Sequence, residues 1–128
     1  FETPQGNRAQ KTDGIISRML PTINRLPSVD VSPLLRRGTR VHEQSFDVVY
    51  IPKENGFRFG FVVSAKVDKR ATARNRIKRL LREAVRSMLP ELVRGVDCVI
   101  VARQSMGNSR ETVEVLLRKA FVKIGVLR

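Results

Sequence analysis

A strongly basic segment with helical periodicity is the feature that most limits how this chain can fold. Residues 69–86 carry eight lysine or arginine side chains and one acidic side chain, Glu83. Wound at about 3.6 residues per turn, the segment gathers its apolar residues on one stripe and most of its cations on the opposite arc. The stripe comprises Ile77, Leu80, Leu81, Ala84, Val85, Met88 and Leu89. The opposite arc is expected to hold Arg74, Asn75, Lys78, Arg79, Arg82 and Arg86. The pattern predicts a helix with one face in a core and a phosphate-binding face outside.

The charge of the whole chain agrees with that prediction. Its 128 residues include 25 Lys and Arg against 12 Asp and Glu, a net charge of +13. Such a balance favours a polyanionic partner, with nucleic acid ahead of an anionic membrane. Cations four residues apart repel one another along a helix, which suggests that a bound anion compensates them. The apolar runs at 59–65 and 99–102 are too short to cross a membrane. Charge alone does not distinguish RNA from DNA.

The order of elements predicts an α+β domain. A short helix should end before Gly38, with Asp30 or Ser32 as its N-cap because proline is tolerated only in the first turn and Pro33 lies close by. Strands are expected at 45–51, 57–66 and 96–103, with the first strand region possibly split in two and a turn at 52–56. The basic helix should occupy 71–89, and a last helix should begin at Asn108 with a capping-box-like Glu111. The order is therefore α-β-β-(β)-α-β-α. We expect residues 1–18, which lack the apolar core of a signal peptide, to form a flexible extension, and residues 19–128 to form a single RNA-binding domain.

Residues suited to catalysis are few. The chain has one histidine, His42, and one cysteine, Cys98, which cannot supply a triad or a metal cluster. We expect His42 to be solvated or hydrogen-bonded and Cys98 to be a buried thiol in a reducing compartment. The scattered glycines form neither a P-loop nor a dinucleotide fingerprint. No catalytic residue and no metal ligand is therefore predicted.

The basic helix also carries a family resemblance. Its residues 74–83 read Arg-Asn-Arg-Ile-Lys-Arg-Leu-Leu-Arg-Glu, and this motif closely resembles the bacterial ribonuclease P protein component. The resemblance extends over about residues 20–128, with weaker matches in the same order at 24–26, 34–38, 58–64 and 97–103. It implies a two-layer α/β sandwich similar to the second domain of ribosomal protein S5, in which the basic helix connects parallel strands through a left-handed β-α-β crossover.

The resemblance also implies a function. The family member is the small protein subunit of a cytoplasmic ribonucleoprotein that removes the 5′ leader from precursor tRNA. Its RNA subunit performs the chemistry with Mg²⁺, which the RNA mainly holds. The implied partners are the catalytic RNA and precursor tRNA, with no membrane and no obligate protein partner. The alternatives left open are a general RNA- or DNA-binding protein, ribosomal or nucleoid-associated, and a self-sufficient nuclease.

Two surfaces follow from this resemblance. The catalytic RNA is expected to bind the basic helix and the loop before it, through Lys66, Lys69, Arg70, Arg74, Asn75, Arg76, Lys78, Arg79, Arg82 and Arg86. The single-stranded leader is expected to bind a cleft between the first helix and the sheet. There Val31 and Leu35 stand where the family commonly has phenylalanines, and Ala65 stands where a lysine is usual. Phe46 and Tyr50 are further candidates for the cleft, although phenylalanines pack in cores more often than they line clefts.

Overall fold

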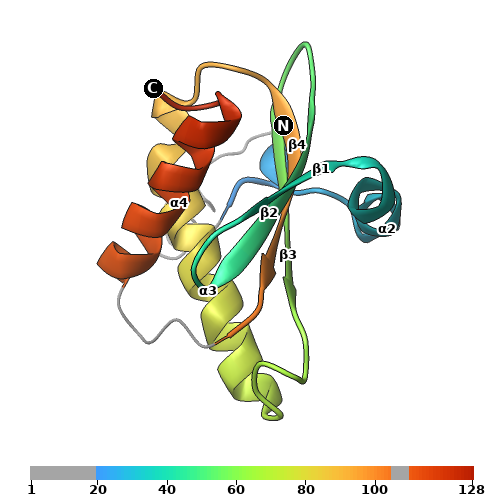
Figure 1. Cartoon of the computed structure of the whole chain (residues 1–128), viewed down its shortest axis with the longest axis vertical. Coiled ribbons are helices and arrows are strands. Elements are labelled where there is room, and N and C mark those ends of the chain that lie inside the picture. Colours follow the sequence, from blue (N-terminus) through green and yellow to red (C-terminus); the bar gives the residue numbers. More distant parts are fainter. Residues whose placement is uncertain (1–19, 105–109) are drawn as a thin grey trace, which may run out of the picture.

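A four-stranded sheet with helices on both faces makes up residues 20–104 and 110–128, the part of the chain that this computed structural model describes. The helices are α2 (Ser28–Arg37), α3 (Ala71–Met88) and α4 (Arg110–Ile124), with short 3₁₀ turns η1 (Thr22–Asn24) and η2 (Leu89–Glu91). The strands are β1 (Thr39–His42), β2 (Phe46–Pro52), β3 (Phe57–Val63) and β4 (Val96–Ala102) (Figure 1). This order confirms the predicted α+β class and includes the optional extra strand. The expected extension at 1–18 and the expected cap at Asn108 lie outside the described residues.

The strands are arranged in the order β1-β2-β4-β3. The last strand, β4, lies between β2 and β3 and pairs antiparallel with β2 and parallel with β3. The predicted turn after β2 is present, and Gly56 adopts a positive φ of 83° there. However, this turn does not join neighbouring strands, because β4 separates them. The chain connects the parallel strands β3 and β4 through α3, which places the basic helix against the sheet.

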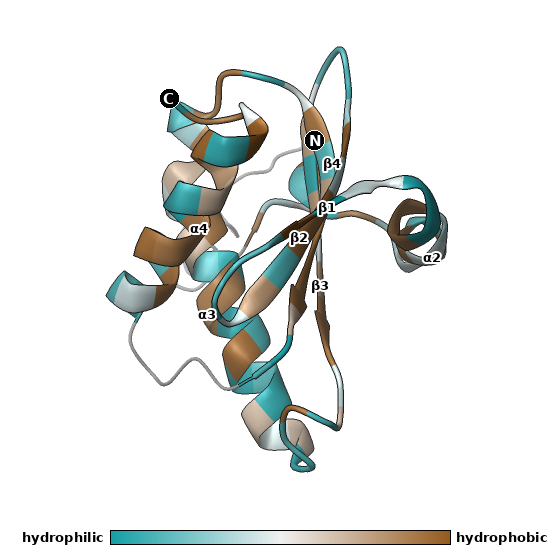
Figure 2. Cartoon of the chain, in the orientation of Figure 1, coloured by the Kyte–Doolittle hydropathy of each residue, from teal (hydrophilic) through white to brown (hydrophobic). Residues whose placement is uncertain are grey.

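The main core lies between the sheet and the helices α3 and α4, which cover the same face (Figure 1). From α3 it receives Ile77, Leu81, Ala84, Val85 and Met88. The rings of Phe59 on β3 and Phe121 on α4 stack with centroids 5.7 Å apart. Figure 2 shows apolar and polar residues side by side along α3, as expected of an amphipathic helix. No helix among the described residues is long and apolar enough to cross a bilayer.

The opposite face of the sheet is covered in part by α2. Leu26 and Leu34 form a second, smaller cluster there with Val99 of β4. The predicted cap of α2 at Asp30 or Ser32 is wrong, because the helix begins at Ser28 after Pro27 and contains Pro33 in its interior. The predicted end before Gly38 is confirmed.

Candidate nucleic-acid interface

The outer face of α3 presents cations that have no carboxylate partner in the described part of the chain. Asn75, Arg76, Arg79 and Arg82 are exposed, whereas Lys78 and Arg86 are half-buried. Among the carboxylates of residues 20–104 and 110–128, none forms an ion pair with a lysine or arginine of this face. Because the buried stripe fixes the helix from behind, these side chains project from a rigid support. The predicted cationic ridge is therefore present, although the Nε of Arg86 is buried and has no hydrogen-bond partner within the described part of the chain.

Arg74 differs from the other cations of the motif. Its Nη1 donates to the backbone carbonyl oxygens of Asp68 and Lys69 at 3.0 and 2.9 Å, and the side chain is half-buried. The spacing predicts Arg74 on the outer arc, and it is half-buried like Lys78 and Arg86, but its guanidinium is directed back to the backbone before the helix. Arg74 instead fixes the loop that leads into α3.

This entry loop is organised by Asp68. Its Oδ1 accepts the backbone N–H of Arg70 at 2.9 Å, and its carboxylate also accepts the Arg70 guanidinium at 3.1 and 3.0 Å. These hydrogen bonds lower the pKa of Asp68 to about 2. Arg70 is therefore partly neutralised within the protein. Lys66 and Lys69, which lie before and after Asp68 in the sequence, are exposed. Of the three loop cations predicted to bind RNA, the two lysines have the freer side chains.

Arg25 is a cation of this surface that the sequence analysis did not select. Its Nε donates to the carbonyl oxygen of Leu20 at 2.8 Å, and its backbone forms an isolated bridge with Phe59 of β3. Burial, followed by the charges of Arg25 and Arg79, lowers the pKa of Arg82. These arginines are thus close enough to repel one another. The available signal was Asn24-Arg25-Leu26, which matched the family motif but was not assigned a contact.

The second predicted surface is only partly assembled. Val31 and Leu35 lie half-buried on the α2 face, against the same cluster as Val62 and Val101. Phe46 is fully buried in the main core on the opposite face, and Tyr50 packs against that same core. The prediction that these two aromatic residues line the cleft is wrong, because alternate residues of a strand point to opposite faces. Ala65 is exposed.

The described residues also show what His42 and Cys98 do. Nδ1 of His42 lies 2.8 Å from Oδ1 of Asp47, and Cys98 is fully buried on β4. Burial, with a smaller contribution from Asp97, raises the pKa of the Cys98 thiol far above its ordinary range. Both predictions, a hydrogen-bonded histidine and a buried thiol, are confirmed.

Comparison with known proteins agrees with this geometry. The family model described as Ribonuclease P matches residues 28–125. The ribonuclease P protein component of Lactobacillus johnsonii is 33% identical over 100 residues, which cover 73% of this chain and 82% of that protein. The corresponding protein of Xylella fastidiosa is 39% identical over 92 residues, which cover 71% and 67%. A shorter match to the Xanthomonas euvesicatoria protein is 51% identical over 67 residues, 52% of this chain, and the chain spans less than half of that relative, 43% of its length.

Solved structures show the same fold. The ribonuclease P protein of Thermotoga maritima superimposes with a TM-score of 0.69 at 25% identity, covering 77% of this chain and 96% of that one. The Staphylococcus aureus protein gives a TM-score of 0.71 at 22% identity, covering 84% and 100%. With the match at 28–125 and the relatives above, these findings show that the chain belongs to the ribonuclease P protein component family.

Proposed function

We propose that this chain is the protein subunit of a cytoplasmic ribonuclease P, where it binds the catalytic RNA and the 5′ leader of precursor tRNA. It thereby assists the Mg²⁺-dependent endonucleolytic removal of the leader. The observation that carries the proposal is the outer face of α3, where Arg76, Arg79 and Arg82 are exposed and have no carboxylate partner among the described residues. Because no carboxylate of the described residues pairs with these arginines, they are available to the phosphates of an RNA.

The shape and chemistry of this face suit a folded RNA. Guanidinium groups present planar, paired donors that match phosphate oxygens, and they also stack on bases. A helix fixed by Leu81 and Val85 keeps those donors in place before the RNA arrives, which reduces the entropy lost on binding. The exposed Lys66 and Lys69 extend the positive surface into the entry loop.

We assign the chemistry to the RNA subunit, together with most of the Mg²⁺. Within the described residues, no group of three or more histidine, cysteine or acidic side chains is placed to hold a metal ion. The described residues therefore do not fit a resident metal site. In this proposal the protein contributes by positioning the substrate and by screening the repulsion between two RNA molecules.

The leader is proposed to cross the sheet face beside α2. Val31 and Leu35 of α2 border an apolar surface that includes the half-buried Val62 and Val101. Such a surface can contact bases and sugars without stacking, since no aromatic side chain of residues 20–104 or 110–128 contributes to this cluster. We therefore expect weak discrimination between leader sequences.

Reconstitution tests the proposal. The chain is mixed with a bacterial ribonuclease P RNA and precursor tRNA at a low Mg²⁺ concentration, where the RNA alone cleaves slowly. Accurate 5′ cleavage that accelerates with added chain and requires the RNA is the expected result. RNA binding without acceleration would instead indicate a general nucleic-acid-binding protein, and cleavage by the chain alone would indicate a self-sufficient nuclease.

A further inference from the structure

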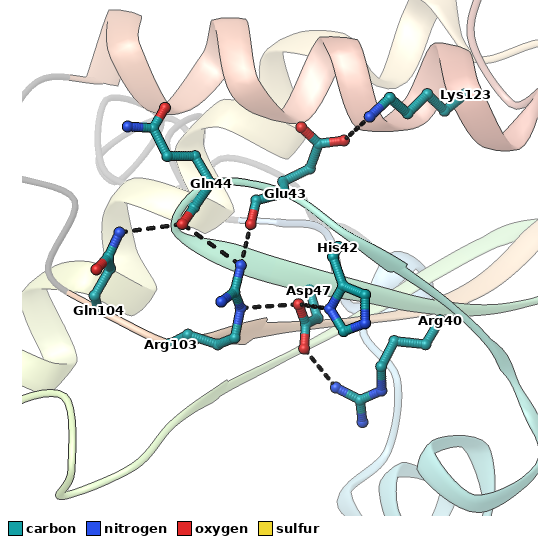
Figure 3. Close-up of polar contacts among 8 residues, drawn as sticks. All are labelled: Arg40, His42, Glu43, Gln44, Asp47, Arg103, Gln104 and Lys123. Carbon is teal, nitrogen blue, oxygen red and sulfur yellow. Dashed lines mark hydrogen bonds and ion pairs between the residues drawn. The ribbon is translucent and has the colours of Figure 1, made fainter.

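Asp47 lies at the centre of a cationic cluster on the sheet face that carries α2. Its buried carboxylate accepts hydrogen bonds from Nη1 of Arg40 at 2.7 Å and from Nδ1 of His42 at 2.8 Å, and it forms an ion pair with Nε of Arg103 at 2.9 Å (Figure 3). Burial alone would raise the pKa of Asp47, but the hydrogen bonds from His42 and Arg40 and the charge of Arg103 hold it below its ordinary value. The carboxylate is therefore ionised at neutral pH, and its three partners are held in fixed positions.

The cluster holds more positive charge than Asp47 can neutralise. Two guanidinium groups share one carboxylate, so at least one positive charge is in excess. Elsewhere on the same sheet, Arg58 directs both Nε and Nη2 at Asp97, at 3.0 and 2.7 Å. By contrast, Arg40 and Arg103 each approach Asp47 through a single nitrogen, which leaves part of each guanidinium available. A single arginine would be enough to neutralise the buried carboxylate of Asp47, so the second guanidinium is not needed for that purpose.

Arg40 and Arg103 are both fixed and accessible. Nη2 of Arg103 also donates to the carbonyl oxygen of Glu43 and lies 3.5 Å from that of Gln44, so this guanidinium is held from two sides (Figure 3). The side chains of Arg40 and Arg103 are nevertheless 41% and 44% exposed. Their unused N–H groups therefore face solvent from a rigid base, which favours binding of an anion.

An apolar floor adjoins this cationic rim. The strand register places His42, Asp47, Val101 and Val62 in one row across β1, β2, β4 and β3. Val101 and Val62 are half-buried and pack against the cluster that includes Leu35 of α2. A ligand that crosses this row from β3 towards β1 contacts the two valines first and then the guanidinium groups at the β1 edge of the sheet. An unpaired nucleotide strand has that composition, with apolar faces on its bases and charge on its phosphates.

We propose that Arg40 and Arg103, positioned by Asp47, bind a backbone phosphate of the single-stranded 5′ leader. The inference rests on the proposed function and extends it, since it adds a phosphate-binding rim opposite α2 to the apolar floor. Arg40 and Arg103 are the residues that contact the ligand, whereas Asp47 acts by holding them.

The test compares two precursor tRNAs, one with a leader long enough to cross the sheet and one with a leader of a single nucleotide. Holoenzyme is titrated under single-turnover conditions, and the half-saturating concentration is measured over a range of salt concentrations. With the long leader, we expect Arg40→Gln to raise the half-saturating concentration about fivefold near 0.1 M salt. The log–log salt slope should also fall by about 0.7, which corresponds to the loss of one phosphate contact on a single strand. The short-leader precursor should be unaffected. The matched control is Arg94→Gln, because Arg94 is an exposed arginine that precedes the first residue of β4. This variant should change the half-saturating concentration for neither precursor.

A double variant separates binding from a structural role. Arg40→Gln alone leaves Asp47 with one partner fewer, which can destabilise the sheet. Arg40→Gln combined with Asp47→Asn removes both charges and leaves the net charge of the chain unchanged. The proposal expects the leader-dependent loss to persist in the double variant. Recovery of the parental affinity for the long leader would show that Arg40 only neutralises Asp47, and equal losses on both precursors would also overturn the proposal. Should the parental chain fail to stimulate cleavage at all, the proposed function itself would fail instead.

Discussion

The guanidinium of Arg82 lies over the ring of Phe61, 5.9 Å from its centroid. A cation above an aromatic face is attracted by the electrons of the ring. The contact joins the exposed face of α3 to β3. A residue of the proposed RNA-binding surface therefore also holds that surface to the sheet. Arg82 consequently has a structural role in addition to the RNA contact proposed for it, and variants of Arg82 cannot report on RNA binding alone.

Arg76 and Arg79 are better reporters of RNA binding. Replacing both with alanine should weaken binding to the catalytic RNA and lower the log–log salt slope by about 1.4–1.8, since each lost phosphate contact removes about 0.7–0.9. Both side chains are exposed and have no ion-pair partner among the described residues, so the melting temperature should remain that of the parent. Filter binding across a salt series measures the slope. Lys119→Ala on the exposed side of α4 is the control, and a slope that stays unchanged in the double variant would show that neither arginine touches a phosphate.

Leu81 anchors α3 from the opposite side. It is fully buried in the main core, so Leu81→Ala should lower the free energy of unfolding by about 2–5 kcal/mol. Val115→Ala on α4 is the matched control, because that valine is 67% exposed and its truncation should cost less than about 0.5 kcal/mol. Urea denaturation measures both. Equal effects of the two truncations would contradict the packing of α3 described above.

Much of the fold could be predicted from the sequence, because its elements carry clear periodicity. The apolar stripe of α3 and the continuous apolar run of β4 each identified one element and nearly its bounds. The position of β4 between β2 and β3 could not be predicted in the same way, since pairing depends on contacts distant in sequence. The start of α2 was also missed. Proline is disfavoured inside a helix, but α2 contains Pro33 in its interior. The packing of Leu34 on the sheet outweighs that local preference.

The candidate site shows a similar limit. The spacing predicted that Arg79 and Arg82 would face outward, and the family resemblance added Arg76. The role of Arg74 depended on the path of the loop through Asp68, which the spacing of charges does not reveal. The cluster around Asp47 was missed because its members come from β1, β2 and the residue after β4. Only the strand register brings Arg40 and Arg103 to the same carboxylate.

Gly38 ends α2 as predicted, but the structure gives a different reason for glycine at this position. It follows α2 as expected, yet its φ of −75° is open to any residue. What requires glycine is space, since a Cβ would lie 2.7 Å from Cγ1 of Val49 and 2.8 Å from the carbonyl oxygen of Leu34. Gly38→Ala should therefore destabilise the fold by about 1–3 kcal/mol and displace α2. The contrasting variant is Gly56→Ala, where nothing lies within 4 Å and the cost, about 1–2 kcal/mol, comes from the positive φ alone.

Amide spectra distinguish these two causes. Gly38→Ala should shift the resonances of Leu34, Val49 and their neighbours, because atoms must move to admit the Cβ. Gly56→Ala should perturb only the turn around itself. If Gly38→Ala left the resonances of α2 in place, the close contact would not be what selects glycine at this position.

Asp47 should make stability depend on pH. The folded-state pKa of its carboxylate lies below the ordinary value, so the group stabilises the fold above the unfolded-state pKa, and this contribution is lost as the pH falls through the folded-state pKa. At pH 7, Asp47→Asn should lower the free energy of unfolding by about 1–3 kcal/mol, because hydrogen bonds from charged partners to a carboxylate are weakened. The difference between the parent and the variant should be present at neutral pH and should narrow below about pH 4.

Denaturation in urea at a series of pH values measures this difference directly. Glu54→Gln is a suitable control, because Glu54 is an exposed carboxylate in the turn after β2 and should give a small difference at every pH. The sign is the decisive feature: a carboxylate held ionised by Arg40, His42 and Arg103 must favour the folded state more as it loses its proton. A parent–variant difference that grew as the pH fell below about 4 would mean that Asp47 is protonated in the fold, and the cationic cluster would then have no fixed anion to organise it.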